Sequence, residues 1–198
     1  MVLGLDEVGR GALAGPVVAA AVAFTPSSRR LLQEEGVNDS KLLSKEKREK
    51  LAKLIKQVAL CWGLGQATNG EIDRRGIVWA TQKAMRQALA RATKTGADRP
   101  QFLLIDAFHV KYLPGVGLKH QRALVKGDQR SLSIAAASIL AKVYRDQLMI
   151  RLARRYPFYR RFHWEQNKGY GTQAHRTAIE RWGVTRYHRK SFLSWLNS

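Results

Sequence analysis

The chain has 198 residues, and 35 lysines and arginines against 15 aspartates and glutamates give it a formal net charge of +20. The length predicts one domain, and a hydrophobic fraction of 45% is enough for a core and excludes a disordered chain. The single cysteine, Cys61, excludes an internal disulfide and a cysteine-based zinc site. No apolar run approaches the roughly 18 residues of a membrane helix, and the N-terminus lacks a secretory pattern, so we expect a cytoplasmic protein without a membrane partner.

So strong a positive charge favours a polyanion, in particular nucleic acid, as the partner. Residues 100–198 carry 18 basic and 5 acidic side chains, and are the more basic half of the chain. This half is therefore the better candidate for contacts with a phosphate backbone.

Apolar runs, helical spacing and turn residues predict the following elements in chain order. They are strands at 3–6 and 17–24, a turn at 25–28, a helix capped by Ser44, a strand at 61–67, a helix over 77–89, strands at 102–105 and 123–125, a long helix from Ser131 or Ser133 to Tyr156, and a helix from the cap Thr172 to Trp182. Early strands followed by alternating strands and helices imply an α/β protein with helices on the faces of its sheet.

Acidic residues follow three of the apolar runs. Asp6 and Glu7 come at the end of the first, Asp106 ends the run at 102–105, and Asp128 comes shortly after the run at 123–125. If the strands before Asp6 and Asp106 are parallel neighbours, the two aspartates meet at the carboxyl edge of the sheet, where open α/β sheets bind ligands.

Glu7 should point away from Asp6, because side chains alternate along a strand. It joins the others only if the backbone turns, which Gly9 and Gly11 permit. Clustered carboxylates suit Mg²⁺ or Mn²⁺, and two such ions about 4 Å apart support phosphodiester hydrolysis. A strand-end aspartate is also a common loop cap, so the pattern alone leaves both interpretations open.

Seven groups of residues, in chain order, match the motifs of one family. They are 4–16, 38–41, 104–106, 126–128, 136–143 with 145–146, 167–172 and 188–192. In these segments the chain resembles type 2 ribonuclease H, the bacterial ribonuclease HII. Ala12 and Ala107 stand where that family usually has proline and often has glycine, and the stretch 160–165 is longer than usual. None of these departures removes an acidic residue.

The resemblance implies a ribonuclease H-like, mixed five-stranded sheet flanked by helices. The catalytic core would span 1–155, and a helical C-terminal extension at 156–198 would contribute to substrate binding. The implied activity is cleavage of the RNA strand of RNA–DNA hybrids and nicking 5′ to single ribonucleotides embedded in duplex DNA, as in ribonucleotide excision repair. By this resemblance the catalytic, metal-binding residues are Asp6, Glu7, Asp106 and Asp128, the cofactor is Mg²⁺ or Mn²⁺, and the products carry 3′-hydroxyl and 5′-phosphate ends.

An enzyme that distinguishes RNA from DNA must recognise the 2′-hydroxyl. Gly9, Arg10 and Gly11 suit this task because a glycine backbone can approach a sugar closely. The pattern alone favours a simple turn with a surface arginine, whereas the resemblance assigns the segment to ribose recognition. It likewise implies that Tyr170 packs at the RNA–DNA junction. Lys41 is a candidate phosphate contact.

Other residues carry weaker signals. Ser138 and Lys142 lie one helical turn apart and could face the site, and Asp146 is expected to pair with a cation. No two of the five histidines have metal-ligand spacing, so we expect surface or capping roles for all five. A monomer is expected, because no oligomer signal is present.

Two other functions fit the composition. One is a non-catalytic basic nucleic-acid binder, which leaves the recurring strand-end carboxylates unexplained. The other is a nuclease of the same fold that acts on DNA.

Overall fold

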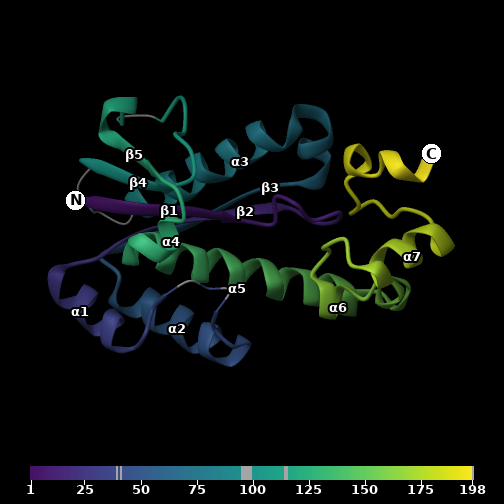
Figure 1. The fold of residues 1–198 in the computed structure, drawn as a ribbon, viewed down its shortest axis with the longest axis horizontal. Coiled ribbons are helices and arrows are strands. Elements are labelled where there is room, and N and C mark those ends of the chain that lie inside the picture. Colours follow the sequence, from purple (N-terminus) through teal and green to yellow (C-terminus); the bar gives the residue numbers. More distant parts are fainter. Residues whose placement is uncertain (39, 41, 95–99, 114–115, 198) are drawn as a thin grey trace.

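The computed structural model describes residues 1–38, 40, 42–94, 100–113 and 116–197. A five-stranded mixed sheet in the order β3-β2-β1-β4-β5 forms its centre (Figure 1). β1 (Val2–Val8) is antiparallel to β2 (Val17–Ala23) and parallel to β4 (Phe102–Asp106). β3 (Cys61–Ala67) pairs antiparallel with β2, and β5 (Gln121–Leu124) pairs parallel with β4. The predicted mixed α/β sheet is confirmed.

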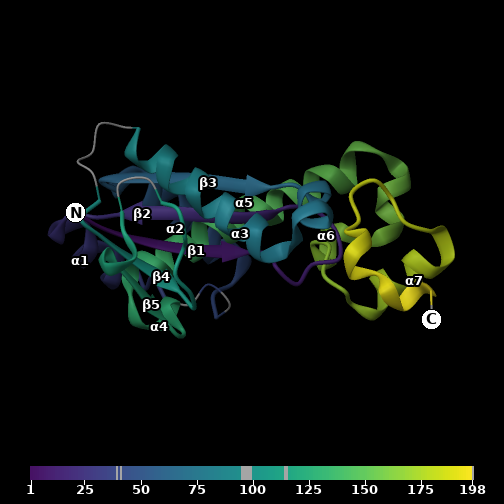
Figure 2. The same cartoon turned by 90° about the horizontal axis from the view of Figure 1, so that it is seen from above.

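Helices cover both faces of the sheet (Figures 1 and 2). α3 (Asn69–Thr93) lies on one face, and α5 (Leu132–Arg155) lies on the other with α1 (Pro26–Glu34) and α2 (Lys45–Val58). Alternate residues of β2 enter the apolar clusters on the two faces, so every residue of this strand is buried. None of the helices in the described ranges has the length and hydrophobicity to span a bilayer.

Two glycines in β3 allow α3 to pack directly on the strand. A Cβ at Gly63 would lie 2.2 Å from the Ala88 carbonyl oxygen, and one at Gly65 would lie 2.0 Å from the Ala84 carbonyl oxygen. A larger residue at either position would push the helix from the sheet. These glycines, which weaken the strand signal in the sequence, are required by the packing of α3.

The segment 25–28, predicted as a turn, instead begins α1. Thr25 is the N-cap, and its hydroxyl accepts a hydrogen bond from the Ser28 amide at 3.2 Å. Pro26 occupies the first turn of the helix, where its missing N–H leaves no intrahelical bond unmade. The prediction was wrong because hydroxyl residues and proline open helices as readily as turns.

Residues 156–197 form a helical extension beyond the carboxyl end of β1 (Figure 2). Its elements are η2 (Pro157–Phe162), α6 (Trp164–Asn167), α7 (Gln173–Trp182), η3 (Lys190–Phe192) and η4 (Ser194–Asn197). Phe162 and Trp164 share an apolar cluster with Leu13, Ala14 and Met149, so the extension packs against the loop after β1 and the end of α5. Two further short helices lie before α5, namely η1 (Leu118–His120) and α4 (Gly127–Arg130).

Two histidines are buried in this extension, contrary to the surface or capping roles expected. His175 and His188 are 0% and 1% exposed, and their Nε2 atoms lie 3.1 Å apart. Trp164 Nε1 donates to His175 Nε2, and the Thr185 amide donates to His188 Nδ1. His188 must therefore carry its proton on Nε2 and donate it to His175, so both rings are neutral.

We predict that this pair makes the fold sensitive to acid. Burial, and then repulsion from His175, lower the pKa of His188 to about 3, and burial also lowers the pKa of His175. In the unfolded chain the imidazoles take up protons near pH 6.5. The contribution of the neutral pair to the free energy of unfolding is therefore complete above pH 6.5 and is lost as the pH falls toward 3. Between pH 7.5 and 5 the free energy of unfolding of the wild type should fall by about 1 to 2 kcal/mol more than that of His188→Gln, because the glutamine side chain does not titrate. Urea unfolding at both pH values measures the difference, and equal losses would contradict a buried neutral His188.

Candidate active site

A cavity of about 450 Å³ lies at the carboxyl end of the parallel strands β1 and β4. Its lining consists of Asp6, Glu7, Val8, Gly9, Ser40, Asp106, Asp128, Ser138, Lys142 and Tyr170. The four predicted acidic residues therefore border one cavity, together with two of the predicted substrate contacts, Gly9 and Tyr170.

The sequence indicated that Glu7 could join the other carboxylates only if the backbone turned after Asp6. The structure shows no turn there. Both residues belong to β1, which continues to Val8 in register with β2. The parallel pairing with β4 ends earlier, at Leu5 and Ile105. Asp6 and Glu7 border the cavity because the strand on one side of them has ended while the strand on the other side continues.

The other two aspartates lie on connected segments. Asp106 ends β4, and its Oδ1 accepts a hydrogen bond of 2.7 Å from the Gly127 amide, directly before Asp128. Ala107 and Lys126 flank this pair with φ values of +64° and +54°. A left-handed conformation costs a residue with a Cβ about 1 to 2 kcal/mol, and such strain is concentrated at functional sites. At Ala107 it also accounts for the glycine often found there in the family that the sequence resembles.

The carboxylates at this site influence one another. Burial, and then the charge of Glu7, raise the pKa of Asp6 well above its usual value; Asp106 adds to the rise, and a hydrogen bond from Ser138 opposes it. Burial also raises the pKa of Glu7, an effect that Arg10 partly offsets and Asp106 reinforces. Three negative groups thus share a poorly solvated space, which is costly unless a cation joins them.

The residues present fit a divalent metal ion. Glu7 Oε2 is buried and has no hydrogen-bond partner in the part of the chain that the structure describes. Carboxylate oxygens are the ligands that Mg²⁺ and Mn²⁺ prefer. Within the described ranges, no three acidic, histidine or cysteine side chains already form a group that could hold an ion.

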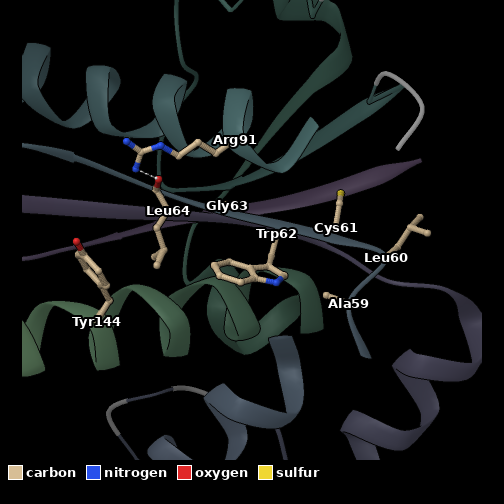
Figure 3. Close-up of a pocket in the computed structure, with 8 residues that line it drawn as sticks. All are labelled: Ala59, Leu60, Cys61, Trp62, Gly63, Leu64, Arg91 and Tyr144. Carbon is tan, nitrogen blue, oxygen red and sulfur yellow. Dashed lines mark hydrogen bonds between the residues drawn. The ribbon is translucent and has the colours of Figure 1, made fainter. Parts of the chain in front are cut away.

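A second cavity, of about 500 Å³, lies beside the edge strand β3 (Figure 3). Trp62, Leu64 and Tyr144 border it, and Arg91 donates a hydrogen bond of 2.7 Å from Nη1 to the Leu64 carbonyl. Its described lining residues include no carboxylate. It is the larger of the two cavities, but it lacks groups for metal-dependent hydrolysis, so we assign the chemistry to the cavity between β1 and β4.

The predicted ribose-reading segment lies at the rim of the active-site cavity. Gly9 has a φ of +94°, and a Cβ on it would lie 2.1 Å from Arg145 Nε, so only glycine fits there. Arg10 Nη1 lies 3.4 Å from Glu7 Oε1. Gly11 is exposed and is not among the residues that line the cavity.

Tyr170 lines the same cavity, and Lys142 Nζ lies 5.7 Å from the centre of its ring. The ion pair expected for Asp146 is confirmed, with Lys142 Nζ at 2.9 Å. Lys41, the predicted phosphate contact, lies outside the described residues.

Sequence reasoning gave no role to Ser40. This residue is buried and lines the cavity, and its hydroxyl lies 2.9 Å from that of Ser138. Its place beside Lys41 in a segment that matches the family was the only available signal.

Comparison with known proteins places this chain in a family. The sequence model of the ribonuclease HII family matches residues 3–195. The chain belongs to the ribonuclease HII family. Ribonuclease HII from Clostridioides difficile (strain 630) is 48% identical over 190 residues, which cover 96% of this chain and 69% of the relative. Ribonuclease HII from Parasynechococcus marenigrum (strain WH8102) is 47% identical over 192 residues, which cover 97% of this chain and 81% of the relative.

Solved structures share the fold. The PCNA:RNase HII complex from Archaeoglobus fulgidus contains a chain with a TM-score of 0.79 and 24% identity, and the match covers 100% of this chain and 97% of that one. Bst-RNase HIII in complex with Mn²⁺ matches with a TM-score of 0.72 and 22% identity, over 96% of this chain and 64% of that one. These likenesses confirm the ribonuclease H-like fold expected from the sequence.

We predict that removing one buried charge stabilises the metal-free protein. The pKa of Asp6 is raised in the folded state, so its stabilising effect is present below the unfolded pKa and is lost as the pH rises; at pH 7 the ionised group destabilises the fold. In chelator, Asp6→Asn should melt about 2 to 4 °C higher than the wild type, the shift that roughly 1 kcal/mol gives in a domain of this size. Added Mg²⁺ or Mn²⁺ should then raise the melting temperature of the wild type more than that of the variant.

Thermal melts with and without metal measure both effects. Glu35→Gln, a carboxylate change on the surface away from the cavity, is the control and should respond to metal as the wild type does. An equal response of Asp6→Asn and the wild type would remove Asp6 from the proposed ligands.

Proposed function

We propose that this chain hydrolyses phosphodiester bonds at ribonucleotides, with two divalent metal ions held by Asp6, Glu7, Asp106 and Asp128. As a member of the ribonuclease HII family it is an endoribonuclease that acts on RNA–DNA hybrids. The observation that carries the proposal is the cavity bordered by all four carboxylates, in a chain with a net charge of +20. We include single ribonucleotides embedded in duplex DNA among its substrates, with cleavage on their 5′ side.

The chain's own residues prepare the site for this reaction. Ser138 holds Asp6 by a hydrogen bond, and the Gly127 amide orients Asp106. Bound Mg²⁺ or Mn²⁺ would activate a water and stabilise the leaving oxygen, so that the products carry 3′-hydroxyl and 5′-phosphate ends. Because water is the nucleophile, no side chain becomes covalently attached to the substrate. Lys142, at the rim of the cavity, supplies a positive charge for the phosphate.

Substrate selection falls to a different set of residues. Gly9, Arg10 and Gly11 recognise the ribose, and Tyr170 packs against the sugar or base at the RNA-to-DNA junction. The position of Tyr170 on the cavity and the absence of a side chain at Gly9 support these roles. Lys41 is proposed to contact a phosphate on the strength of the sequence alone.

The domain division follows from these roles. We propose a catalytic core at 1–155 and a substrate-binding extension at 156–198, acting as a monomer in the cytoplasm. The extension supplies Tyr170 to a cavity whose carboxylates all belong to the core.

A nicking assay tests the proposal. The wild type with Mg²⁺ or Mn²⁺ should nick a duplex that contains one ribonucleotide, should leave an all-DNA duplex of the same sequence intact, and should lose its activity in chelator. Asp128→Asn should reduce cleavage by roughly a hundredfold or more while affinity for the duplex changes little, because the substitution removes a metal ligand and leaves the basic surface in place.

Each alternative outcome has a distinct meaning. Equal cutting of both duplexes would indicate a DNA-directed nuclease, and salt-sensitive binding without cleavage would indicate a non-catalytic binder. Retained turnover in Asp128→Asn would exclude Asp128 from the site. Glu35→Gln is the matched control and should cleave as the wild type does.

A further inference from the structure

Two arginines are buried completely without a carboxylate partner. Arg145, on α5, and Arg189, between α7 and η3, are each 0% exposed. In the described part of the chain neither forms an ion pair. Burial lowers the pKa of both, that of Arg189 to about 9. Arginine side chains stay cationic at neutral pH in proteins. A buried charge without a counter-ion is expensive, and it persists only where hydrogen bonds compensate.

Six backbone carbonyls supply that compensation, and five of them belong to the loop at 9–16. Arg145 donates to the carbonyls of Ala14, Pro16 and Lys168 at 2.9 to 3.0 Å. Arg189 donates to the carbonyls of Gly9, Arg10 and Gly15 at 2.7 to 3.0 Å. The planar fork of each guanidinium thus holds three carbonyls at once through donors on three separate nitrogens, a geometry that the single nitrogen of an ammonium group does not reproduce.

The direction of these carbonyls determines what the loop presents to a substrate. In a trans peptide the C=O of one residue and the N–H of the next point in opposite directions. The carbonyls of Gly9 and Arg10 point toward Arg189, so the amides of Arg10 and Gly11 point away from it. Neither amide donates a hydrogen bond to another group in the described ranges. Two adjacent outward N–H groups above a buried positive charge form a suitable site for an oxygen of the ribose or phosphate.

The same two arginines connect this loop to the segment that carries Tyr170, the other proposed substrate contact. Arg145 bonds the Lys168 carbonyl, and its guanidinium lies 5.1 Å from the centre of the Tyr170 ring. The Arg189 amide donates to the Leu13 carbonyl at 2.8 Å, which fixes the extension to the loop. The loop after β1 is therefore shaped by one cation from the core and one from the extension.

We propose that Arg145 and Arg189 are positioning residues for ribose recognition: they hold the carbonyls of the loop at 9–16 inward so that its amides meet the 2′-oxygen of the substrate. This rests on the proposed function, because it takes the ribonucleotide as the group that is read. Arg189, which does not touch the cavity, then acts on specificity through the backbone of Gly9 and Arg10.

A double-mutant cycle, with one change in the enzyme and the other in the substrate, tests this role. Wild type and Arg189→Lys are compared on a duplex with one ribonucleotide and on the same duplex with 2′-fluorine in place of the 2′-hydroxyl. Lysine keeps the charge but does not reproduce the spaced donors of the guanidinium fork that hold the three carbonyls. Arg189→Lys should lower kcat/KM on the ribonucleotide by about tenfold or more, while its Kd for an all-DNA duplex stays within about twofold. Replacing the 2′-hydroxyl by fluorine should lower kcat/KM strongly in the wild type and by only about threefold or less in Arg189→Lys. The smaller effect is expected because the contact between the loop amides and the 2′-oxygen is already impaired in the variant.

The outcomes separate the two claims. If the wild type does not nick the ribonucleotide duplex, the proposed function fails. If it does, and fluorine costs both enzymes the same factor, Arg189 does not position the ribose-reading loop. A parallel loss of affinity for all-DNA duplex would also overturn the proposal, since it would indicate general loosening of the extension.

Matched variants keep the test decisive. Arg151 is an exposed arginine on α5. Arg151→Lys should leave unchanged both the kcat/KM on the ribonucleotide duplex and the factor by which fluorine lowers it. Arg145→Lys repeats the cycle from the core side and decides the question if Arg189→Lys lacks a cooperative melting transition. Retention of the full fluorine effect in Arg145→Lys would contradict the shared role of the two arginines.

Discussion

Repulsion between carboxylates that the fold buries side by side is the constraint on which the rest of the site depends. Burial, reinforced by neighbouring carboxylates, raises the pKa of Asp6 and of Glu7, and Glu7 Oε2 is buried without a partner in the described chain. Other protein groups compensate only part of this negative charge. They are the Ser138 hydroxyl, Arg10 and the amides of Glu7 and Gly127. The proposed divalent cations would offset the remaining cost.

The fold places opposite charges close together along one strand and its loop. Asp6 and Glu7 in β1 face the cavity, and two residues later Gly9 lies against the buried guanidinium of Arg145. Negative groups therefore border the cavity proposed to hold metal, while positive groups lie behind the loop proposed to contact the sugar. Both arrangements store free energy in the unliganded protein that substrate and metal can recover on binding.

Most of the sheet was predictable from the sequence, because β1, β2 and β4 contain apolar runs bounded by turn residues. The fifth strand was expected at 123–125 but lies at Gln121–Leu124, where Gln121 is buried and Val125 is exposed. The beginning of α1 was not predictable, since Thr25 and Pro26 suit a turn as well as a helix. The site was predictable as a group of aspartates at strand ends. Glu7 was expected at the site only if the backbone turned, but it borders the cavity without a turn, because β1 continues through it beyond the end of its pairing with β4. Four buried polar residues were missed: His175, His188, Arg145 and Arg189 carry no local signal of burial, and their partners lie far away in the sequence.

Anomalous scattering from crystals grown with Mn²⁺ tests the central claim most directly. The account predicts manganese peaks in the cavity between β1 and β4, with carboxylate oxygens of Asp6, Glu7, Asp106 and Asp128 about 2 Å from the ions. A cavity without manganese at saturating concentration, or manganese bound only by other residues, would contradict it.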